Sequence, residues 1–118
     1  MLDQDNYPDE ASLKQITEWD VFSQGIDGLL TLIGENTNWA DRQIYRSGKW
    51  VIRYHYHTGG WSGNEDVIEA LQQNLMFWSL FWEKTMKGGH YYFKIDRRRI
   101  EKQADAKTQG SQDTPQQT

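Results

Sequence analysis

The sequence predicts a small α+β domain in which a three-stranded sheet packs on helices, in the order α-α-β-β-α-β. Three observations lead to this class. Apolar residues recur at helical spacing before residue 35, apolar and polar residues alternate over 50–57, and a second helical pattern precedes another alternating run at 90–95. A chain of 118 residues has the size of one domain. We expect the folded domain to span residues 8–100.

Two short helices are expected at the start of the domain. Acidic residues directly after Pro8 are typical of a helix start, because they interact favourably with the helix dipole. Gly25 and Gly28 weaken the second helix by roughly 1 kcal/mol each relative to alanine, and Gly34 or Asn36 can end it. Its apolar stripe consists of Phe22, Ile26, Leu29, Leu30 and Ile33.

A β-hairpin is expected next, with its turn at Ser47-Gly48. A two-residue turn would place Tyr45 on the same face as Trp50 and Ile52, and we expect that face to cover the core. The opposite face of the second strand carries Val51, Arg53, His55 and His57.

One long helix is expected over residues 63–87, ended by Gly88-Gly89. The third strand follows at 90–95. If it lies beside the second strand, the two strands would be parallel and joined by a right-handed crossover.

The segment GGWSGNED, residues 59–66, has two interpretations. Ser62 and Glu65 have the spacing of a capping box, which would begin the long helix. A phosphate-binding turn is the alternative, although the segment lacks the lysine and hydroxyl residue of a P-loop. Trp61 either covers the core from outside or is exposed for a ligand.

Composition excludes several classes of protein. The chain has no cysteine, so disulfides and thiolate zinc sites are excluded. Its longest apolar run, residues 75–82, is too short to span a membrane, and its acidic start is unlike a secretory signal. We therefore expect a cytoplasmic protein. The polar tail, residues 101–118, is expected to be disordered because it offers almost no apolar surface to bury.

The apolar run of the long helix suggests a surface for binding another protein. Its large side chains occupy nearly the whole helix circumference, so the sheet alone cannot cover them. Either the N-terminal helices close the remaining side, or an aromatic patch is left for a partner or for a second copy of the chain. The candidate contact residues are Trp61, Phe77, Phe81 and Trp82.

The outer face of the sheet offers an alternative binding surface. By alternation it carries Arg53, His55, His57, His90, Tyr92 and Lys94. Stacking rings and cations would suit single-stranded nucleic acid, although the net charge of −4 opposes general attraction to it. The three histidines could instead form a zinc site, or the face could simply be solvated.

Catalysis has little support in the sequence. Glu65 and His90 form the only acid–base pair worth testing. A parallel crossover would place them at opposite ends of the sheet. We therefore expect a binding protein without enzymatic activity and without a cofactor.

Three short motifs resemble small uncharacterised proteins encoded by bacteriophages and prophages. They are W-S-G-N-E (61–65), F-W (77–78) and G-G-H-Y (88–91). The resemblance covers about half of the folded chain. It implies a phage accessory protein that acts by binding, and it assigns no catalytic residues.

Overall fold

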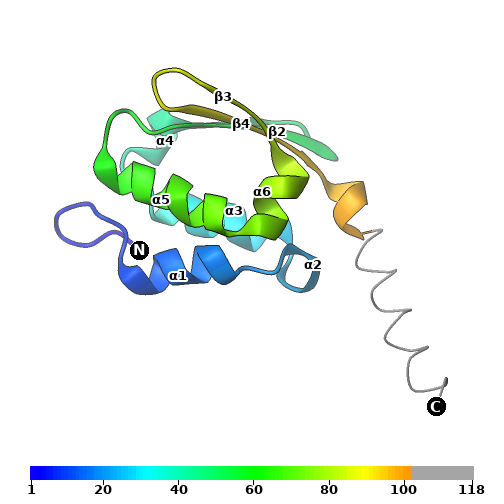
Figure 1. Cartoon of the computed structure of the whole chain (residues 1–118), viewed down its shortest axis with the longest axis horizontal. Coiled ribbons are helices and arrows are strands. Elements are labelled where there is room, and N and C mark those ends of the chain that lie inside the picture. The colour runs from blue at the N-terminus through cyan, green and yellow to red at the C-terminus, as the bar shows by residue number, and fades with distance from the viewer. Residues whose placement is uncertain (102–118) are drawn as a thin grey trace, which may run out of the picture.

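The structure is a computed structural model that describes residues 1–101. One antiparallel sheet has the strand order β1-β2-β4-β3, and the helices α1, α3, α5 and α6 lie on one of its faces (Figure 1). The predicted α+β class is confirmed, but the sheet has four strands rather than three. All of the tail predicted to be disordered except Glu101 lies outside the described residues.

The first half of the chain forms four helices: α1 (Glu10–Glu18), α2 (Val21–Gln24), α3 (Ile26–Glu35) and α4 (Ala40–Gln43). The side chain of Asp9 caps α1 by accepting a hydrogen bond from the Ser12 backbone N–H at 2.8 Å. The single second helix that we expected is divided at Gly25, whose φ of 83° is unsuited to a helix interior. Asn36 ends α3, as the sequence predicts.

The four strands are β1 (Ile44–Ser47), β2 (Val51–His57), β3 (Trp82–Met86) and β4 (His90–Asp96). The hairpin between β1 and β2 is confirmed, but its predicted register is wrong. Tyr45 pairs with His55, so Tyr45 lies on the face away from the core and is 68% exposed. Residues 48–50 separate the strands instead of two, and a shift of one residue moves every β1 side chain to the other face. Trp50 lies in this turn, 54% exposed.

The long helix expected over 63–87 is replaced by α5 (Ser62–Gln73), α6 (Leu75–Phe81) and β3. Asn74 interrupts the helix, and its side chain caps α6 by accepting a hydrogen bond from the Phe77 backbone N–H at 3.1 Å. The predicted parallel crossover is therefore wrong. Because β3 forms a hairpin with β4 through Gly88-Gly89, β4 runs antiparallel to β2.

The core lies between the sheet and the helices. Its largest members are fully buried: Tyr56, Phe77, Phe81, Phe93, Ile16, Leu29, Ile33, Ile52, Leu71 and Ile95. The apolar run of 75–82 is thus divided between two environments. Phe77 and Phe81 fill the core, while Leu75 and Trp82 remain 76% and 42% exposed.

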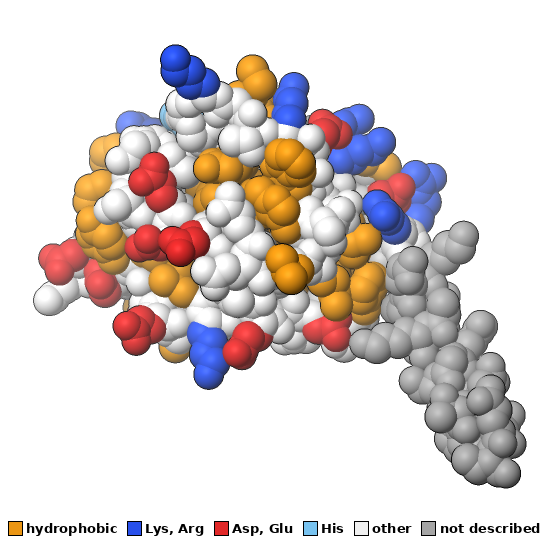
Figure 2. All heavy atoms as spheres, viewed as in Figure 1, with side chains coloured by type: hydrophobic (Ala, Val, Ile, Leu, Met, Phe, Trp, Pro, Cys, Tyr) orange, Lys and Arg blue, Asp and Glu red, His pale blue; other side chains and the backbone are white. Residues whose placement is uncertain are grey.

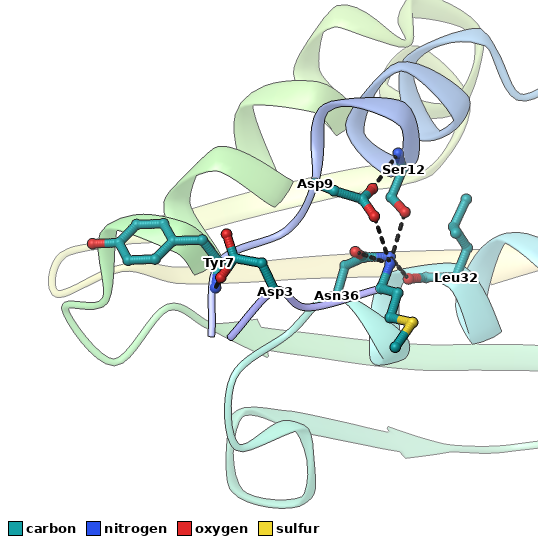
Figure 3. A network of polar contacts seen from close by, with 7 residues as sticks. Asp3, Tyr7, Asp9, Ser12, Leu32 and Asn36 are labelled. Atoms are coloured by element: carbon teal, nitrogen blue, oxygen red, sulfur yellow. Dashed lines mark hydrogen bonds and ion pairs between the residues drawn. The ribbon is translucent and has the colours of Figure 1, made fainter. Parts of the chain in front are cut away.

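The first residues of the chain also contact the domain (Figure 3). The Met1 ammonium donates hydrogen bonds to Ser12 Oγ at 2.7 Å and to Asn36 Oδ1 at 2.5 Å. It also lies 3.9 Å from the carboxylate of Asp9. This network joins the start of α1 to the end of α3.

Candidate functional site

One face of the sheet lies opposite the helices, and we refer to it as the open face (Figure 1). The register pairs Arg53 with Lys94, His55 with Tyr92 and His57 with His90, which confirms that these six residues share one face. Its charged and aromatic members include Tyr45 from β1, Arg53, His55 and His57 from β2, Lys84 from β3, and His90, Tyr92, Lys94 and Asp96 from β4.

Four rings on the open face form two stacked pairs, Tyr92 with His55 and His57 with His90, and the two pairs meet edge to edge between His55 and His90. The ring centroids of Tyr92 and His55 are 4.3 Å apart, those of His55 and His90 are 5.2 Å apart, and those of His90 and His57 are 4.0 Å apart. Each ring is therefore stacked on one face by its cross-strand partner.

His55 and His90 are joined by a hydrogen bond, with 3.0 Å between His55 Nε2 and His90 Nδ1. The pKa of His55 lies below its ordinary value, chiefly because the ring is partly buried and also because His90 and His57 are close. A zinc site is one predicted use of the three histidines. Residues 1–101 contain no group of three or more His, Cys, Asp or Glu side chains that could hold a metal ion.

A groove of about 320 Å³ lies on the open face beside this stack. Arg53 Nη1 lies 3.3 Å from Glu83 Oε2 at the groove. Lys84 Nζ lies 4.9 Å from the ring centroid of Tyr92. The groove is lined by Tyr45, Arg53, Tyr54, His55, Glu83, Tyr92 and Phe93.

Sequence reasoning missed three residues in or beside this groove. The predicted two-residue turn places Tyr45 on the wrong face of the sheet. The predicted long helix over 63–87 includes Glu83 and Lys84, which belong to β3. A hairpin signal was present, because Gly88-Gly89 stands between a short run and the alternating strand that follows.

The segment GGWSGNED does begin a helix, but the predicted capping box is wrong. The residue before α5 is Trp61, and no side chain of the described residues caps this helix start. The hydroxyl group of Ser62 lies 2.8 Å from that of Tyr7 instead, and Glu65 is exposed. The Trp61 Nε1–H donates to the Asn6 carbonyl oxygen at 3.2 Å. Trp61 is thus partly covered by the N-terminal segment.

Asn64 is the buried polar residue of this segment, 1% exposed. Its amide donates to the carbonyl oxygen of Thr58 at 3.1 Å, and its Oδ1 accepts from the backbone N–H of Asn38 at 2.8 Å. Asn64 therefore ties the start of α5 to the end of β2 and to the loop before α4. The sequence reasoning assigned it no role.

The prediction that Glu65 and His90 lie at opposite ends of the sheet is wrong. Since β2 and β4 are antiparallel, the end of β2 and the start of β4 meet, and His57 pairs with His90. α5 begins shortly after β2, so Glu65 belongs to the same end of the sheet. No hydrogen bond or ion pair between Glu65 and His90 is present among the described residues.

The residues predicted to contact a protein partner are separated by the structure. Phe77 and Phe81 are buried, so the expectation that they form a surface is wrong. Trp82 is exposed, and Trp61 is covered in part by the N-terminal segment. The other exposed apolar side chains near Trp82 in sequence are Leu75, Met76 and Met86.

No family model matches this chain, and no curated protein or solved structure matches it. The resemblance to small phage proteins therefore stays a prediction. In the part of the chain that the structure describes, no helix is both long and apolar enough to cross a membrane.

Proposed function

We propose that this protein binds single-stranded nucleic acid on the open face. The groove between Tyr45 and the His55–Tyr92 pair is the observation that carries this proposal. Its volume of about 320 Å³ is within the range of small-ligand sites, which suits one nucleobase. Proteins that bind single strands combine aromatic contacts to bases with cations that follow the phosphates.

Tyr45 supplies the aromatic contact. It is 68% exposed, and none of the ring pairs among the described residues includes it. A base in the groove can stack on this free ring, while Arg53 and Glu83 offer a donor and an acceptor to its polar edge.

Cations near the groove supply the phosphate contacts. Arg53 and Lys94 face each other across β2 and β4, and Lys84 lies above Tyr92. Most Asp and Glu side chains visible in Figure 2 lie over the helices, whereas Lys and Arg gather near β3 and residues 97–101. The net charge of −4 therefore does not describe the sheet side of the molecule.

Fluorescence anisotropy with a labelled twelve-nucleotide oligo-dT tests the proposal. We expect binding that weakens as salt rises, because cations on the protein release counterions from the strand. Tyr45→Ala and Arg53→Ala should each weaken binding about tenfold, as expected for the loss of one stacked base or one charge-assisted contact. Lys14→Ala, on the helical side, is the matched charge control and should change little.

A blunt DNA duplex of equal length separates the proposal from general attraction to polyanions. Equal affinity for the duplex, or unchanged binding by the Tyr45→Ala protein, would contradict a base in the groove. Absence of binding at low salt would remove the proposal altogether.

Self-association is the second candidate function. Of the eight exposed large hydrophobic residues in the described part of the chain, four fall within residues 75–86, with Leu75 at 76% and Trp82 at 42% exposure. Burial of such side chains between two copies would stabilise a dimer. Light scattering over a range of concentrations tests this, with Trp82→Ser expected to shift a dimer toward monomer. A monomer at every concentration would exclude it.

A further inference from the structure

We propose that His55, His57 and His90 make nucleic-acid binding proton-linked, so that affinity rises as the pH falls through the range in which imidazoles titrate. This inference rests on the proposed function, and it assigns a regulatory role to the three histidines of the open face.

The geometry of the three rings requires at least one neutral imidazole in the free protein. The bond between His55 Nε2 and His90 Nδ1 needs one nitrogen with a hydrogen and one without. If both rings were cationic, two N–H groups would point at each other. His57 stacks on His90 at 4.0 Å, so a third positive charge would lie against the same pair.

The charged and titratable groups around the cluster are mostly cationic. The acidic groups of the described face are Glu83, which is paired with Arg53 at 3.3 Å, and Asp96, which lies at the other end of β4 from His90 and is paired with Arg98 at 3.0 Å. The groups on each strand of the face are Tyr45 on β1, Arg53 on β2, Glu83 and Lys84 on β3, and Tyr92, Lys94 and Asp96 on β4. In the free protein the cations among these groups disfavour a charged imidazole. The pKa of His55 is lowered chiefly by partial burial and then by the nearby His90 and His57.

A bound nucleic-acid strand would reverse this balance. Its phosphates add negative charge beside the exposed ring edges, and a cationic imidazole donates stronger hydrogen bonds to phosphate than a neutral one. The pKa of at least one imidazole must then rise on binding. By linkage, a strand that raises an imidazole pKa binds more tightly when that imidazole is already protonated.

Oligo-dT is a suitable probe because neither thymine nor the phosphodiester titrates between pH 5.5 and 8. At constant ionic strength, we expect the labelled oligonucleotide to bind roughly five- to tenfold more tightly at pH 5.5 than at pH 7.5, which corresponds to an average uptake of roughly 0.35–0.5 proton over these two pH units. The double variant His57→Gln, His90→Gln should lose most of this pH dependence. Lys14→Ala should retain it.

NMR titration of the imidazole Cε1–H signals provides a readout that does not depend on affinity. Adding oligo-dT should raise the pKa of at least one of the three rings. Binding that is independent of pH, with imidazole pKa values unchanged by the oligonucleotide, would overturn the proton linkage and leave the proposed function standing. No binding at any pH would overturn both.

Discussion

The side-chain amide of Asn74 donates a hydrogen bond of 2.9 Å to the backbone carbonyl oxygen of Ile16, a residue 58 positions earlier in the chain. The same amide donates to the Trp19 carbonyl oxygen at 2.9 Å. Asn74 also caps α6, so one buried side chain satisfies the end of α1 and the start of α6. The interruption of the helix at this position is therefore fixed by polar contacts in the core.

Replacing Asn74 should destabilise the protein substantially. Asn74→Ala leaves the two carbonyl oxygens without this donor and removes the cap, so we expect a loss of about 2–3 kcal/mol in the free energy of unfolding. Gln73→Ala changes the exposed neighbour and should stay within about 0.5 kcal/mol. Urea denaturation followed by tryptophan fluorescence measures both. Equal losses for the two variants would show that Asn74 acts only through helix propensity.

Tyr54 and Tyr56 are both buried, and we expect their replacement by phenylalanine to change the stability of the protein differently. The Tyr54 hydroxyl has no hydrogen-bond partner among the described residues, whereas the Tyr56 hydroxyl lies 2.8 Å from that of Thr37. We expect Tyr54→Phe to be neutral or stabilising, and Tyr56→Phe to lose about 1 kcal/mol. Thermal unfolding of the two variants at neutral pH measures the difference, and the reverse order would contradict the assigned contacts.

Stability should also fall at high pH because of these two residues. Burial raises the pKa of Tyr54 and Tyr56 above the ordinary value of 10.0. Below pH 10 both states keep the phenols neutral, so their contribution is constant. Above pH 10 the unfolded chain ionises first and the free energy of unfolding decreases. Urea midpoints between pH 8 and pH 11 measure this, and the decrease should be smaller in the Tyr54→Phe protein.

Two glycines of α3 should respond to alanine in opposite directions. A Cβ atom at Gly28 would lie 2.7 Å from Cζ2 of Trp19, whose Nε1–H donates to the Gly25 carbonyl oxygen at 2.8 Å. Because this ring is held in place, we expect Gly28→Ala to lose about 1–3 kcal/mol of stability. At Gly34 no described atom outside the local helix lies within 4 Å of the added Cβ, so alanine should gain about 0.5–1 kcal/mol. Differential scanning calorimetry of both proteins tests the pair.

Asp27 should contribute to stability only above the pH at which its carboxylate forms. Arg97 donates to both carboxylate oxygens, at 2.7 and 2.9 Å, and this pairing lowers the pKa of Asp27. A lowered pKa means that the contribution is present above the unfolded pKa and is lost as the pH falls. The pair is exposed, so Asp27→Asn should lose less than about 1 kcal/mol at pH 7. The difference from the unmodified protein should disappear near pH 2 and shrink in 1 M salt.

The outer face of β2 and β4 could be predicted because strand alternation depends on residues adjacent in sequence. The alternation of Arg53, His55 and His57 places them on one face whether the neighbouring strand is parallel or antiparallel. The same holds for His90 and its neighbours on β4. The six residues named from the sequence therefore do share the open face.

The direction and number of strands depended on contacts that are distant in sequence. Residues 82–86 have an apolar content that suits the end of a helix, and they become a strand because β4 offers them an edge. The break at Asn74 depends on carbonyl groups near residue 16, which lie far away in the chain. Local pattern alone cannot supply either partner.

The sequence predicts only part of the candidate site, because some of its residues depend on contacts that are distant in sequence. Strand alternation predicts that His55 and His90 lie on the same face of the sheet. The face on which Tyr45 lies depends on the length of the turn before β2. Glu83 depends on a strand that the helical interpretation removed. The prediction that Phe77 and Phe81 belong to an aromatic surface is wrong, because the fold buries both side chains. Trp82 is exposed, and its contact with a partner stays a prediction.

The contact between Trp61 and the N-terminal segment has a consequence for the glycine-rich corner. Tyr7 lies against the Trp61 ring, with 5.2 Å between centroids, and Asn6 accepts the indole hydrogen. A molecule that approached the start of α5 on this side would compete with the chain's own first residues. If that segment were detached only one percent of the time, the apparent affinity of the competitor would be about a hundredfold weaker than its intrinsic value. Removing residues 1–7 would then make Trp61 and the start of α5 accessible to such a molecule.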